Sequence, residues 1–324
     1  MPKAIRFHQP GGPDVLVWDD VQVGDPGPGE VRVRHHAVGV NYIDVYQRAG
    51  LYKVPLPSGV GSEGAGVVEA LGAGVADLKT GDRVAYASAP IGAYSEVRLY
   101  PANRLVKLPP AISFETAAAM MLKGMTVQYL IRRTFKVQRG MTVLWQAAAG
   151  GVGLIACQWL KSLGVTVIGT VGSDAKAAVA KAHGCDYPVV YTRENFVERV
   201  KEITAGKGVP VVYDSVGKDV FTGSIDSLSP LGMYVNFGNA SGPVPPVEPL
   251  LLSQKGSLYM TRPTLVTYTA KRDDLLASAN ELFEVVQSGT VKIEIDQRRA
   301  LKDAAQAHRD LEARKTTGST ILLP

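Results

Sequence analysis

A turn of small residues between two predicted elements is the first stretch of the chain that could do chemistry. An apolar run at 142–146 predicts a buried strand, and the turn at 147–153 holds only alanine, glycine and one valine. A predicted helix at 154–163 and a second strand at 165–170 follow. Strand, glycine turn, helix and strand in this order are typical of dinucleotide binding, because small residues admit a pyrophosphate and the helix N-terminus offers free N–H groups. An ordinary tight turn in a parallel sheet is the alternative.

The residues that follow the second strand bear on the choice of nicotinamide cofactor. An NAD-binding unit usually carries an acid about 20 residues beyond the glycine turn, where it binds the ribose hydroxyls. This strand ends at Thr170 and continues into Val171-Gly172-Ser173 without an acid. Asp174 is a rival, but capping of the next helix accounts for it. The ammonium of Lys176 could face a 2′-phosphate, so we expect NADPH rather than NADH, the alternative being a solvated lysine.

Residues that bind metals are sparse in this sequence. Catalytic zinc needs about three ligands from Cys, His and carboxylate, and the five histidines, at positions 8, 35, 36, 183 and 308, show no such spacing. His35 and His36 lie in a predicted strand and should point to opposite faces. The two cysteines, Cys157 and Cys185, cannot build a disulfide framework. We expect no metal, so hydrogen-bond donors must polarise a substrate carbonyl.

The composition is that of an ordinary globular protein. The 324 residues, with 46% hydrophobic and 20% charged, suffice for two domains with ample core. The net charge is +5, and the basic residues are scattered, so we expect no nucleic acid partner. No apolar run reaches membrane-spanning length and the N-terminus does not resemble a signal peptide, which predicts a cytoplasmic protein without a membrane partner.

Two kinds of secondary structure must position the glycine turn. Many short strands with Gly and Pro punctuation over 1–110 predict a small barrel-like β domain. A largely helical stretch at 113–135, interrupted at Lys123-Gly124, marks the passage to a second domain. From 141 onward strands and helices alternate, which predicts a parallel, doubly wound sheet. The tail is predicted as helix 273–288, strand 291–295, helix 301–314 and strand 319–323.

A long pattern runs through the glycine turn: Gly140-Met141, Leu144, the run Ala148-Ala149-Gly150-Gly151, then Gly153, Gln158 and Lys161. It resembles the signature of the quinone oxidoreductases and zeta-crystallins, in the medium-chain dehydrogenase/reductase superfamily. Segments at 41–44, 48–52, 122–127, 212–217 and 254–259 resemble the bacterial NADPH:quinone reductase branch. The resemblance covers essentially the whole chain.

Two departures place the chain nearer to the zinc-free branch of that superfamily. Zinc-dependent relatives carry Cys where this chain has Asn41, and Gly-His-Glu where it has Gly61-Ser62-Glu63. The cysteine-rich loop for structural zinc is also missing. The resemblance therefore weighs against an alcohol dehydrogenase.

The resemblance implies an α/β fold in which a doubly wound Rossmann sheet is inserted between two parts of a GroES-like β-barrel catalytic domain. The expected bounds are 1–124 and 263–324 for the catalytic domain and 125–262 for the NADPH-binding domain. The active site would lie in the cleft, facing the glycine turn. A homodimer would form through the outer strand of the Rossmann sheet, near 256–260.

The resemblance also implies a set of site residues. Around the pyrophosphate these are Gly150, Gly151, Val152 and Gly153. Around the adenosine 2′-phosphate they are Gly172, Ser173, Lys176 and Tyr191. Along the groove and on the nicotinamide side they are Val216, Phe237, Gly238, Ser241, Thr126 and Tyr129. From the interdomain edge and the tail come Met260, Thr261, Arg262 and Arg314. The catalytic candidates are Asn41, Tyr46 and Tyr52.

The function implied by the resemblance is NADPH-dependent reduction of a quinone by hydride transfer, without a metal. Asn41 and Tyr46 are candidate donors to the developing oxyanion, and the proton would come from water or a tyrosine hydroxyl. Each tyrosine could instead be a packing residue. Two other functions stay open: an NADPH-dependent enone or alkenal double-bond reductase, and an RNA-binding or structural crystallin-like protein. The modest charge and the lack of an aromatic-basic platform weigh against RNA.

Overall fold

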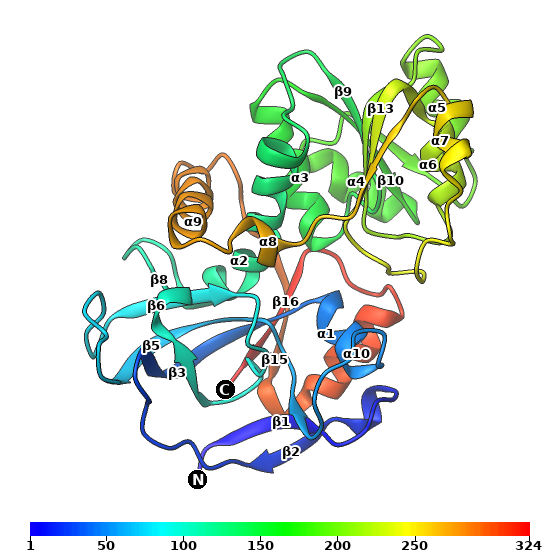
Figure 1. The fold of residues 1–324 in the computed structure, drawn as a ribbon. Coiled ribbons are helices and arrows are strands. Elements are labelled where there is room, and N and C mark those ends of the chain that lie inside the picture. The colour runs from blue at the N-terminus through cyan, green and yellow to red at the C-terminus, as the bar shows by residue number, and fades with distance from the viewer. The chain divides into compact units, whose positions relative to one another are not determined.

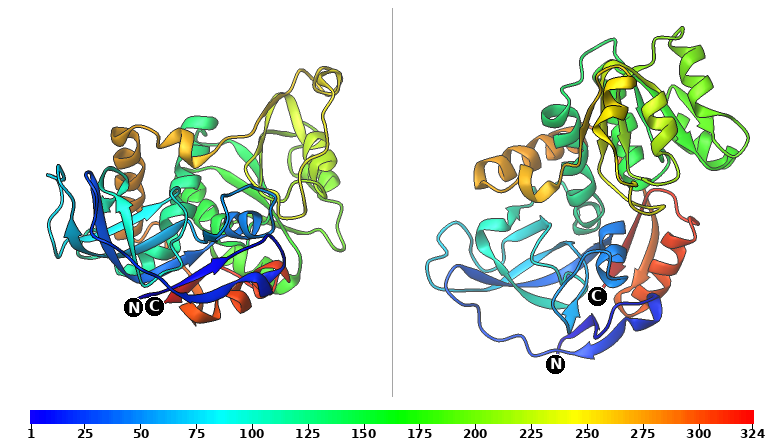
Figure 2. Two further views of the ribbon diagram at one scale, coloured as in Figure 1. Left: turned by 60° about the horizontal axis from the view of Figure 1, so that its bottom comes forward. Right: turned by 45° about the vertical axis from the view of Figure 1, so that its right-hand side comes forward.

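The computed structural model describes residues Met1–Pro324 and divides them into two compact units. Unit 1 consists of Met1–Met125, Tyr268–Gln287 and Ile293–Pro324, and it holds both termini (Figure 2). Unit 2 consists of Thr126–Thr267 and Ser288–Lys292. No helix combines the length and the apolar character needed to cross a membrane.

The larger sheet of unit 1 is built on the long strand β3 (Glu30–Val40), which pairs with strands from both ends of the chain. Val31 and Val33 of β3 are buried while Arg34 is exposed, so apolar and polar residues alternate as a half-buried strand requires. His35 is buried and His36 is exposed, which confirms the predicted opposite faces. The order of the sheet is β15 (Ile295–Ala300), β16 (Ser319–Leu323), β3, β5 (Glu63–Leu71), β6 (Arg83–Ala87) and β8 (Val106–Lys107), with β7 (Val97–Pro101) also on β3.

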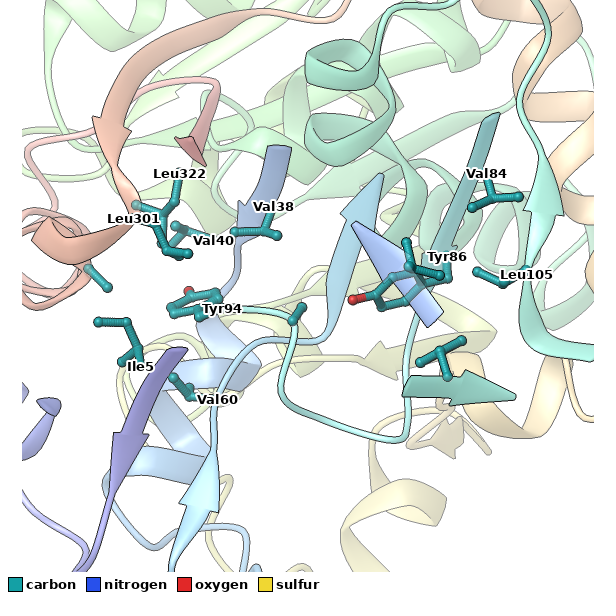
Figure 3. Packing of buried hydrophobic residues seen from close by; sticks show 14 of the residues in the cluster. Ile5, Val38, Val40, Val60, Val84, Tyr86, Tyr94, Leu105, Leu301 and Leu322 are labelled. Atoms are coloured by element: carbon teal, nitrogen blue, oxygen red, sulfur yellow. The ribbon is translucent and has the colours of Figure 1, made fainter. Parts of the chain in front are cut away.

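A smaller sheet closes unit 1 over a shared apolar core. Its strands are ordered β2 (Val17–Asp20), β1 (Lys3–Phe7) and β4 (Ser58–Gly59). Figure 3 shows Val38 and Val40 of β3 close to Leu322 of β16, with Ile5 of β1 nearby. Residues from the two ends of the sequence therefore share one core, as the inserted-domain arrangement requires.

The helices of unit 1 include one correction to the sequence predictions. They are α1 (Tyr42–Arg48), α2 (Phe114–Tyr129), α9 (Arg272–Gln287) and α10 (Ala304–Glu312), together with short 3-10 turns at Pro13–Val15, Ala102–Arg104 and Leu301–Asp303. The interruption predicted at Lys123-Gly124 is wrong, because α2 runs through both residues. A Cβ on Gly124 would lie 2.4 Å from Cδ1 of Leu282 in α9, so this glycine permits close helix packing instead of breaking a helix.

The strand predicted at 291–295 is also wrong, since β15 begins only at Ile295. The backbone of Lys292 donates its N–H to Oε1 of Gln158 over 2.8 Å, and its carbonyl accepts from Nε2 of Gln158 over 3.0 Å. The side-chain amide of Gln158 therefore satisfies the backbone N–H and carbonyl of Lys292, which in a strand would be hydrogen-bonded to a neighbouring strand.

Unit 2 is a six-stranded parallel sheet with helices on both faces, which confirms the predicted doubly wound fold. The strand order is β11 (Tyr187–Val190), β10 (Thr166–Val171), β9 (Thr142–Trp145), β12 (Val209–Asp214), β13 (Leu228–Asn236) and β14 (Tyr259–Thr261). The order reverses between β9 and β12, so a crevice is expected at the carboxyl ends of these two strands. The glycine turn follows β9 at this edge of the sheet.

Helices of unit 2 cover the two faces of that sheet. Figure 1 shows α3 on one side, and α5, α6 and α7 on the other. Phe221 and Ile225 of α6 pack with Leu144 and Tyr234 of the strands in one apolar cluster. The helices are α3 (Gly151–Ser162), α4 (Asp174–Ala182), α5 (Phe196–Ile203), α6 (Phe221–Asp226) and α7 (Pro249–Gln254), with a π turn at Leu130–Thr134 and α8 at Leu265–Tyr268.

Candidate functional site

The glycine turn of unit 2 is held in place by the neighbouring strand β10. The N–H of Ala148 donates to the carbonyl of Thr170 over 2.9 Å, and the N–H of Ala147 donates to the Thr170 hydroxyl over 3.2 Å. That hydroxyl in turn donates to Oε1 of the buried Gln146 over 2.6 Å. The end of β10 thus fixes the path of the backbone from β9 into α3.

The start of α3 is shaped to accept an anion. A Cβ on Gly153 would lie 2.5 Å from the carbonyl oxygens of both Ala147 and Ala148, so only glycine fits there. The first helical hydrogen bond is Leu154 N–H to the carbonyl of Gly150, and Gly150 adds no side-chain cap. The N–H groups of residues 151–153 therefore have no acceptor within the helix and stand at its positive end.

Four of the predicted 2′-phosphate residues come together at the end of β10. Ser173 caps α4, its hydroxyl accepting from the N–H of Lys176 over 3.3 Å. A Cβ on Gly172 would lie 2.9 Å from the hydroxyl of the exposed Tyr191, so this tyrosine lies against Gly172. The loop after β10 thus gathers a glycine, a hydroxyl, a lysine and a tyrosine at one end of the crevice.

The carboxylate of Asp174, the rival candidate for binding the ribose hydroxyls of NAD, is paired with Arg193. It accepts from Nη1 of Arg193 over 2.5 Å, and this hydrogen bond lowers the pKa of Asp174. Arg193, which was not among the residues predicted from the sequence, is the partner of Asp174. A carboxylate that is paired with a guanidinium repels a nearby phosphate less than an unpaired carboxylate would.

The carboxyl end of β12 is organised by the buried Asp214. Its carboxylate accepts from the N–H of Val216 over 2.6 Å and of Gly217 over 3.1 Å, and from the hydroxyl of Tyr234 over 2.5 Å. Burial raises the pKa of Asp214, and these donors oppose the rise. The carboxylate therefore fixes the turn that carries Val216.

The loop after β13 is tied to the same turn. The Ser241 hydroxyl donates to the carbonyl of Val216 over 2.9 Å, and a Cβ on Gly238 would lie 2.5 Å from the carbonyl of Ser215. The ring of Phe237 lies 5.6 Å from that of Trp145, centre to centre. The structure thus brings Val216, Gly238 and Ser241 together beside Phe237, four residues that the resemblance implied for the cofactor site.

The remaining predicted residues of unit 2 lie at separate places. Met260 and Thr261 are in the edge strand β14, and Arg262 follows them and donates to the carbonyl of Asn236 over 3.1 Å. Thr126 and Tyr129 lie in the last turns of α2, and both are buried. Arg314 belongs to unit 1, where it follows α10 with a positive φ of 56°.

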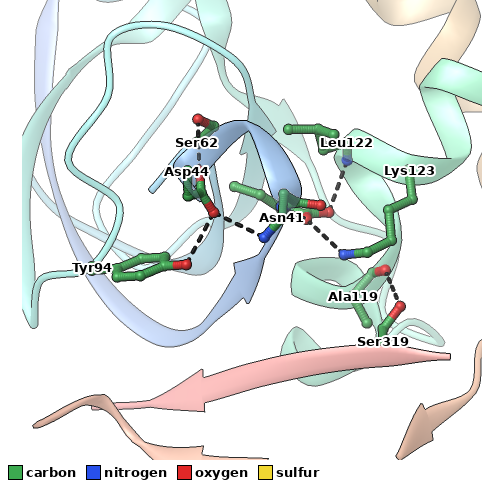
Figure 4. Close-up of polar contacts among 9 residues, drawn as sticks. Asn41, Asp44, Ser62, Tyr94, Ala119, Leu122, Lys123 and Ser319 are labelled. Atoms are coloured by element: carbon green, nitrogen blue, oxygen red, sulfur yellow. Dashed lines mark hydrogen bonds and ion pairs between the residues drawn. The ribbon is translucent and has the colours of Figure 1, made fainter. Parts of the chain in front are cut away.

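Asn41 of unit 1 is the N-cap of α1 and belongs to a buried polar cluster (Figure 4). Its Nδ2 atom donates to Oε2 of Glu63 over 2.8 Å. The other carboxylate oxygen, Oε1, accepts from the backbone N–H of Leu122 over 2.8 Å. Nζ of Lys123 lies 3.4 Å from Oε2, and Glu63 and Lys123 are both buried. Burial raises the pKa of Glu63, and the Lys123 charge opposes the rise.

A second buried carboxyl group, that of Asp44, is hydrogen-bonded to the backbone of Asn41. Its Oδ2 accepts from the Asn41 N–H over 2.9 Å and from the Tyr94 hydroxyl over 3.0 Å, and its Oδ1 accepts from the Ser62 hydroxyl over 3.1 Å. The Tyr94 hydroxyl also lies 3.1 Å from Nε2 of His308 on α10. Burial raises the pKa of Asp44 to about 7 and lowers that of His308 to about 3. Because Tyr94 donates to Asp44, neutral His308 must donate through Nε2.

The two predicted tyrosines lie beside one another. The rings of Tyr46 on α1 and Tyr52 in the following loop are 5.4 Å apart and meet edge to face, and Tyr42 lies 5.8 Å from Tyr46. The Tyr52 N–H donates to the carbonyl of Tyr46 over 3.1 Å. Asn41, Tyr46 and Tyr52 therefore come from one short helix and its exit loop.

Sequence reasoning missed several members of these clusters. The residues not predicted are Asp44, Ser62, Glu63, Tyr94, Lys123, Arg193, Asp214 and His308. Asn41 and Asp44 have the spacing of a helix capping box, and that signal was available in the sequence. Nothing in the sequence links Tyr94 and His308 to Asp44, since they are distant along the chain and meet only through tertiary structure.

Two known families match this chain. Residues 27–110 match the family described as alcohol dehydrogenase GroES-like domain. Residues 151–281 match the family described as zinc-binding dehydrogenase. The first match lies within unit 1, and the second begins at the first residue of α3.

Relatives of known function cover the chain from end to end. It is 57% identical to a quinone oxidoreductase of Pseudomonas aeruginosa, with both chains fully covered. It is 46% identical to a 2-haloacrylate reductase of Burkholderia, covering 100% of this chain and 99% of that protein. Among solved structures, Escherichia coli quinone oxidoreductase complexed with NADPH has a TM-score of 0.98 at 50% identity, covering 99% of this chain and 100% of that one.

The residues present do not fit the zinc that one matching family name implies. Around Asn41 the available groups are an amide, the Ser62 hydroxyl and the Glu63 carboxylate, and that carboxylate is already paired with an ammonium. No group of three His, Cys, Asp or Glu side chains is placed to hold a metal ion. Thiolate and imidazole ligands, which zinc prefers, are missing from this cluster.

Proposed function

The chain belongs to the quinone oxidoreductase family of zinc-free medium-chain dehydrogenases/reductases, and we propose that it is an NADPH-dependent quinone reductase. The observation that carries this proposal is the group of residues at the carboxyl end of β10 in unit 2, where the adenosine of the cofactor would lie. There Ser173, Lys176 and Tyr191 lie around the end of β10, and the carboxylate of Asp174 is paired with Arg193. This surface accepts the additional phosphate that distinguishes NADPH from NADH.

The residues of unit 2 bind and orient the cofactor. The unpaired N–H groups at the start of α3 bind the pyrophosphate, and Gly153 permits its close approach. The turn held by Asp214 and Ser241 presents Val216 along the groove. When bound, NADPH supplies the hydride for the reaction.

The residues of unit 1 act on the substrate. Reduction of a quinone places negative charge on an oxygen, and a donor preorganised toward that oxygen lowers the barrier. Asn41 offers an amide N–H from a rigid, capped helix end, and Tyr46 offers a hydroxyl one turn along α1. The proton that completes the hydroquinone comes from water or a tyrosine hydroxyl.

The proposal is tested by steady-state kinetics of the purified protein with a panel of quinones. We expect turnover with NADPH and a higher kcat/KM for NADPH than for NADH. A higher kcat/KM with NADH would refute the cofactor assignment, and no turnover of any quinone would refute the substrate class.

A second candidate is reduction of an activated carbon–carbon double bond. It is favoured by the similarity to 2-haloacrylate reductase, whose name describes such a substrate. Both reactions place charge on an oxygen conjugated with the accepting atom, so the same donors serve either one. Enones, alkenals and haloacrylates in the same assay distinguish the two, because a higher kcat/KM for these compounds than for quinones reverses the order.

We also propose a homodimer joined through β14. This strand is at the edge of the sheet of unit 2 and exposes Tyr259 by 58% and Met260 by 37%. An unpaired edge strand with exposed apolar side chains favours pairing with a second copy. Size-exclusion chromatography with light scattering should give the mass of two chains, and Tyr259→Asp should shift it toward one.

We further propose that the protein works in the cytoplasm. Both cysteines, Cys157 and Cys185, are free and buried, which suits a reducing compartment. Fractionation of the source cells with an antibody to this chain tests the location, and recovery in a secreted or membrane fraction would contradict it.

A further inference from the structure

We propose that Glu63 and Lys123 are positioning residues that fix the side-chain amide of Asn41, so that one of its N–H groups is turned to the substrate oxygen. This inference rests on the proposed function, in which Asn41 donates to the oxygen that gains charge. Neither residue needs to touch the substrate, because each acts through Asn41.

The orientation of the Asn41 amide follows from its hydrogen-bond partners. An ionised carboxylate can only accept, so the NH₂ end of the amide must face Glu63, at 2.8 Å. The side-chain oxygen faces the N–H of Asp44, which is shared with the main-chain oxygen of Asn41 in the capping box. One N–H of the amide remains uncommitted. A group left with one donor and no acceptor suits an oxyanion.

Donors on both carboxylate oxygens favour the ionised form of Glu63. The Leu122 N–H binds Oε1, while Asn41 and the Lys123 ammonium share Oε2 (Figure 4). A carboxyl proton would have no acceptor among these three groups. Burial raises the pKa of Glu63 and favours its neutral form, and the Lys123 charge is the largest of the effects that oppose this rise.

The geometry around Glu63 leaves no room for another arrangement. A Cβ on Gly39 of β3 would lie 2.4 Å from Oε2 of Glu63, so the backbone of β3 closes on the carboxylate. The Leu122 N–H belongs to the backbone of α2 and cannot turn away. If position 63 carried glutamine, its oxygen would stay with Leu122 and its NH₂ would face Asn41. The Asn41 amide would then have to turn, and its NH₂ would meet the N–H of Asp44.

A double-mutant cycle tests whether Glu63 acts through Asn41. We expect Glu63→Gln to lower kcat by about tenfold or more, which is part of the ~10²–10³ that a lost oxyanion donor costs. The Kd for NADPH, measured by fluorescence titration, should stay within about twofold, because the residues proposed to bind the pyrophosphate and the 2′-phosphate are in unit 2. In an Asn41→Ala background, Glu63→Gln should change kcat by less than about twofold.

The outcomes separate this inference from the proposed function. If Asn41→Ala keeps the full kcat, Asn41 is not a donor and both ideas are wrong. If Asn41→Ala lowers kcat but Glu63→Gln lowers it by the same factor in both backgrounds, only the positioning role is wrong. A matched control is Glu115→Gln. Glu115 lies on α2 and forms an exposed ion pair with Arg298 of β15, so this change removes a carboxylate charge at the surface and should leave kcat unchanged.

Lys123→Met gives an independent test that does not require the Glu63 variant to fold. The titratable groups around Glu63 are Lys123 on α2, Asp44 on α1, Tyr86 on β6 and Tyr94. Removal of the ammonium raises the pKa of Glu63 further, so the acid-side loss of kcat should move to higher pH. The double variant Glu63→Gln, Lys123→Met should lack this limb. A kcat profile of Lys123→Met that superimposes on that of the wild type would overturn the proposal.

Discussion

The hydroxyl of Tyr94 donates to the carboxyl group of Asp44 over 3.0 Å, at a place where neither side chain reaches solvent. Three donors surround this carboxyl group, and no cation is paired with it. Burial dominates, so the pKa of Asp44 rises to about 7 from its ordinary 3.8. A buried acid that titrates near neutral pH makes the stability of the fold depend on pH.

The first prediction concerns that dependence. Because the folded state binds the Asp44 proton more tightly than the unfolded state, its stabilising effect is fully present below pH 3.8 and is lost as pH rises through about 7. Asp44→Asn keeps the acceptor for Asn41 and Tyr94 and cannot ionise. Between pH 5 and 8, calorimetry should show Tm of the wild type falling relative to this variant, by roughly 2–4 °C per kcal/mol. Parallel curves would contradict the prediction, and exposed Asp25→Asn is the control.

The second prediction concerns the glycine turn. Gly153→Ala places a Cβ 2.5 Å from two carbonyl oxygens, so the backbone must shift and both Tm and NADPH affinity should fall. Overpacking of this kind costs about 1–3 kcal/mol. Gly150→Ala is matched to it, since its Cβ would be 3.4 Å from the nearest oxygen and its φ is −78°. Thermal unfolding should show the loss only for Gly153→Ala, and equal losses would refute the steric argument.

The third prediction concerns the choice of cofactor. Lys176→Glu puts a carboxylate at the start of α4, where it repels a 2′-phosphate, so KM for NADPH should rise by about tenfold or more. KM for NADH should change much less. Lys181→Glu makes the same charge change on an exposed position of the same helix and serves as the control. An equal rise in KM for both cofactors in Lys176→Glu would show that this lysine does not read the phosphate.

The fourth prediction concerns the oxyanion donors. Asn41→Ala and Tyr46→Phe should each lower kcat, by up to ~10²–10³ for a fully effective donor. Tyr42→Phe removes a hydroxyl from the same helix that donates to the carbonyl of Leu311 over 3.3 Å. It should cost at most about 1 kcal/mol of stability and leave kcat intact. If Asn41→Ala and Tyr46→Phe both retain full kcat, these residues are only the wall of the pocket.

Much of the fold follows from local pattern. The parallel sheet of unit 2 was predictable because several of its strands are short apolar runs followed by a helix, as at Thr142–Trp145 and Gly151–Ser162. The errors arose where a tertiary contact overrides local preference. Gly124 was interpreted as a helix break, but it lies within α2 and leaves room for the side chain of Leu282. The segment Val291–Ile295 was interpreted as a strand, but the backbone of Lys292 is hydrogen-bonded to the side chain of Gln158.

The site was only partly predictable, for a related reason. Gly153, Ser173 and Val216 were predicted as site residues from a resemblance that short segments of the sequence carry. The groups that hold the side chain of Asn41 are distant from it in sequence. Glu63 and Lys123 reach Asn41 from β5 and α2, and His308 reaches Asp44 through Tyr94. Such pairs leave no periodic signal, and only the fold reveals them.

The pairing of β3 with β16 has a consequence for how the protein is made. Val38 and Val40, near the start of the chain, find their partners Leu322 and Thr320 among its last residues. The N-terminal part of a chain leaves the ribosome first. Unit 2 therefore emerges and can fold while one side of β3 still lacks its neighbour β16. During that interval the nascent protein exposes an unsatisfied strand edge, which invites association between neighbouring chains. Loss of the final strand should therefore produce insoluble protein rather than a weakly active one.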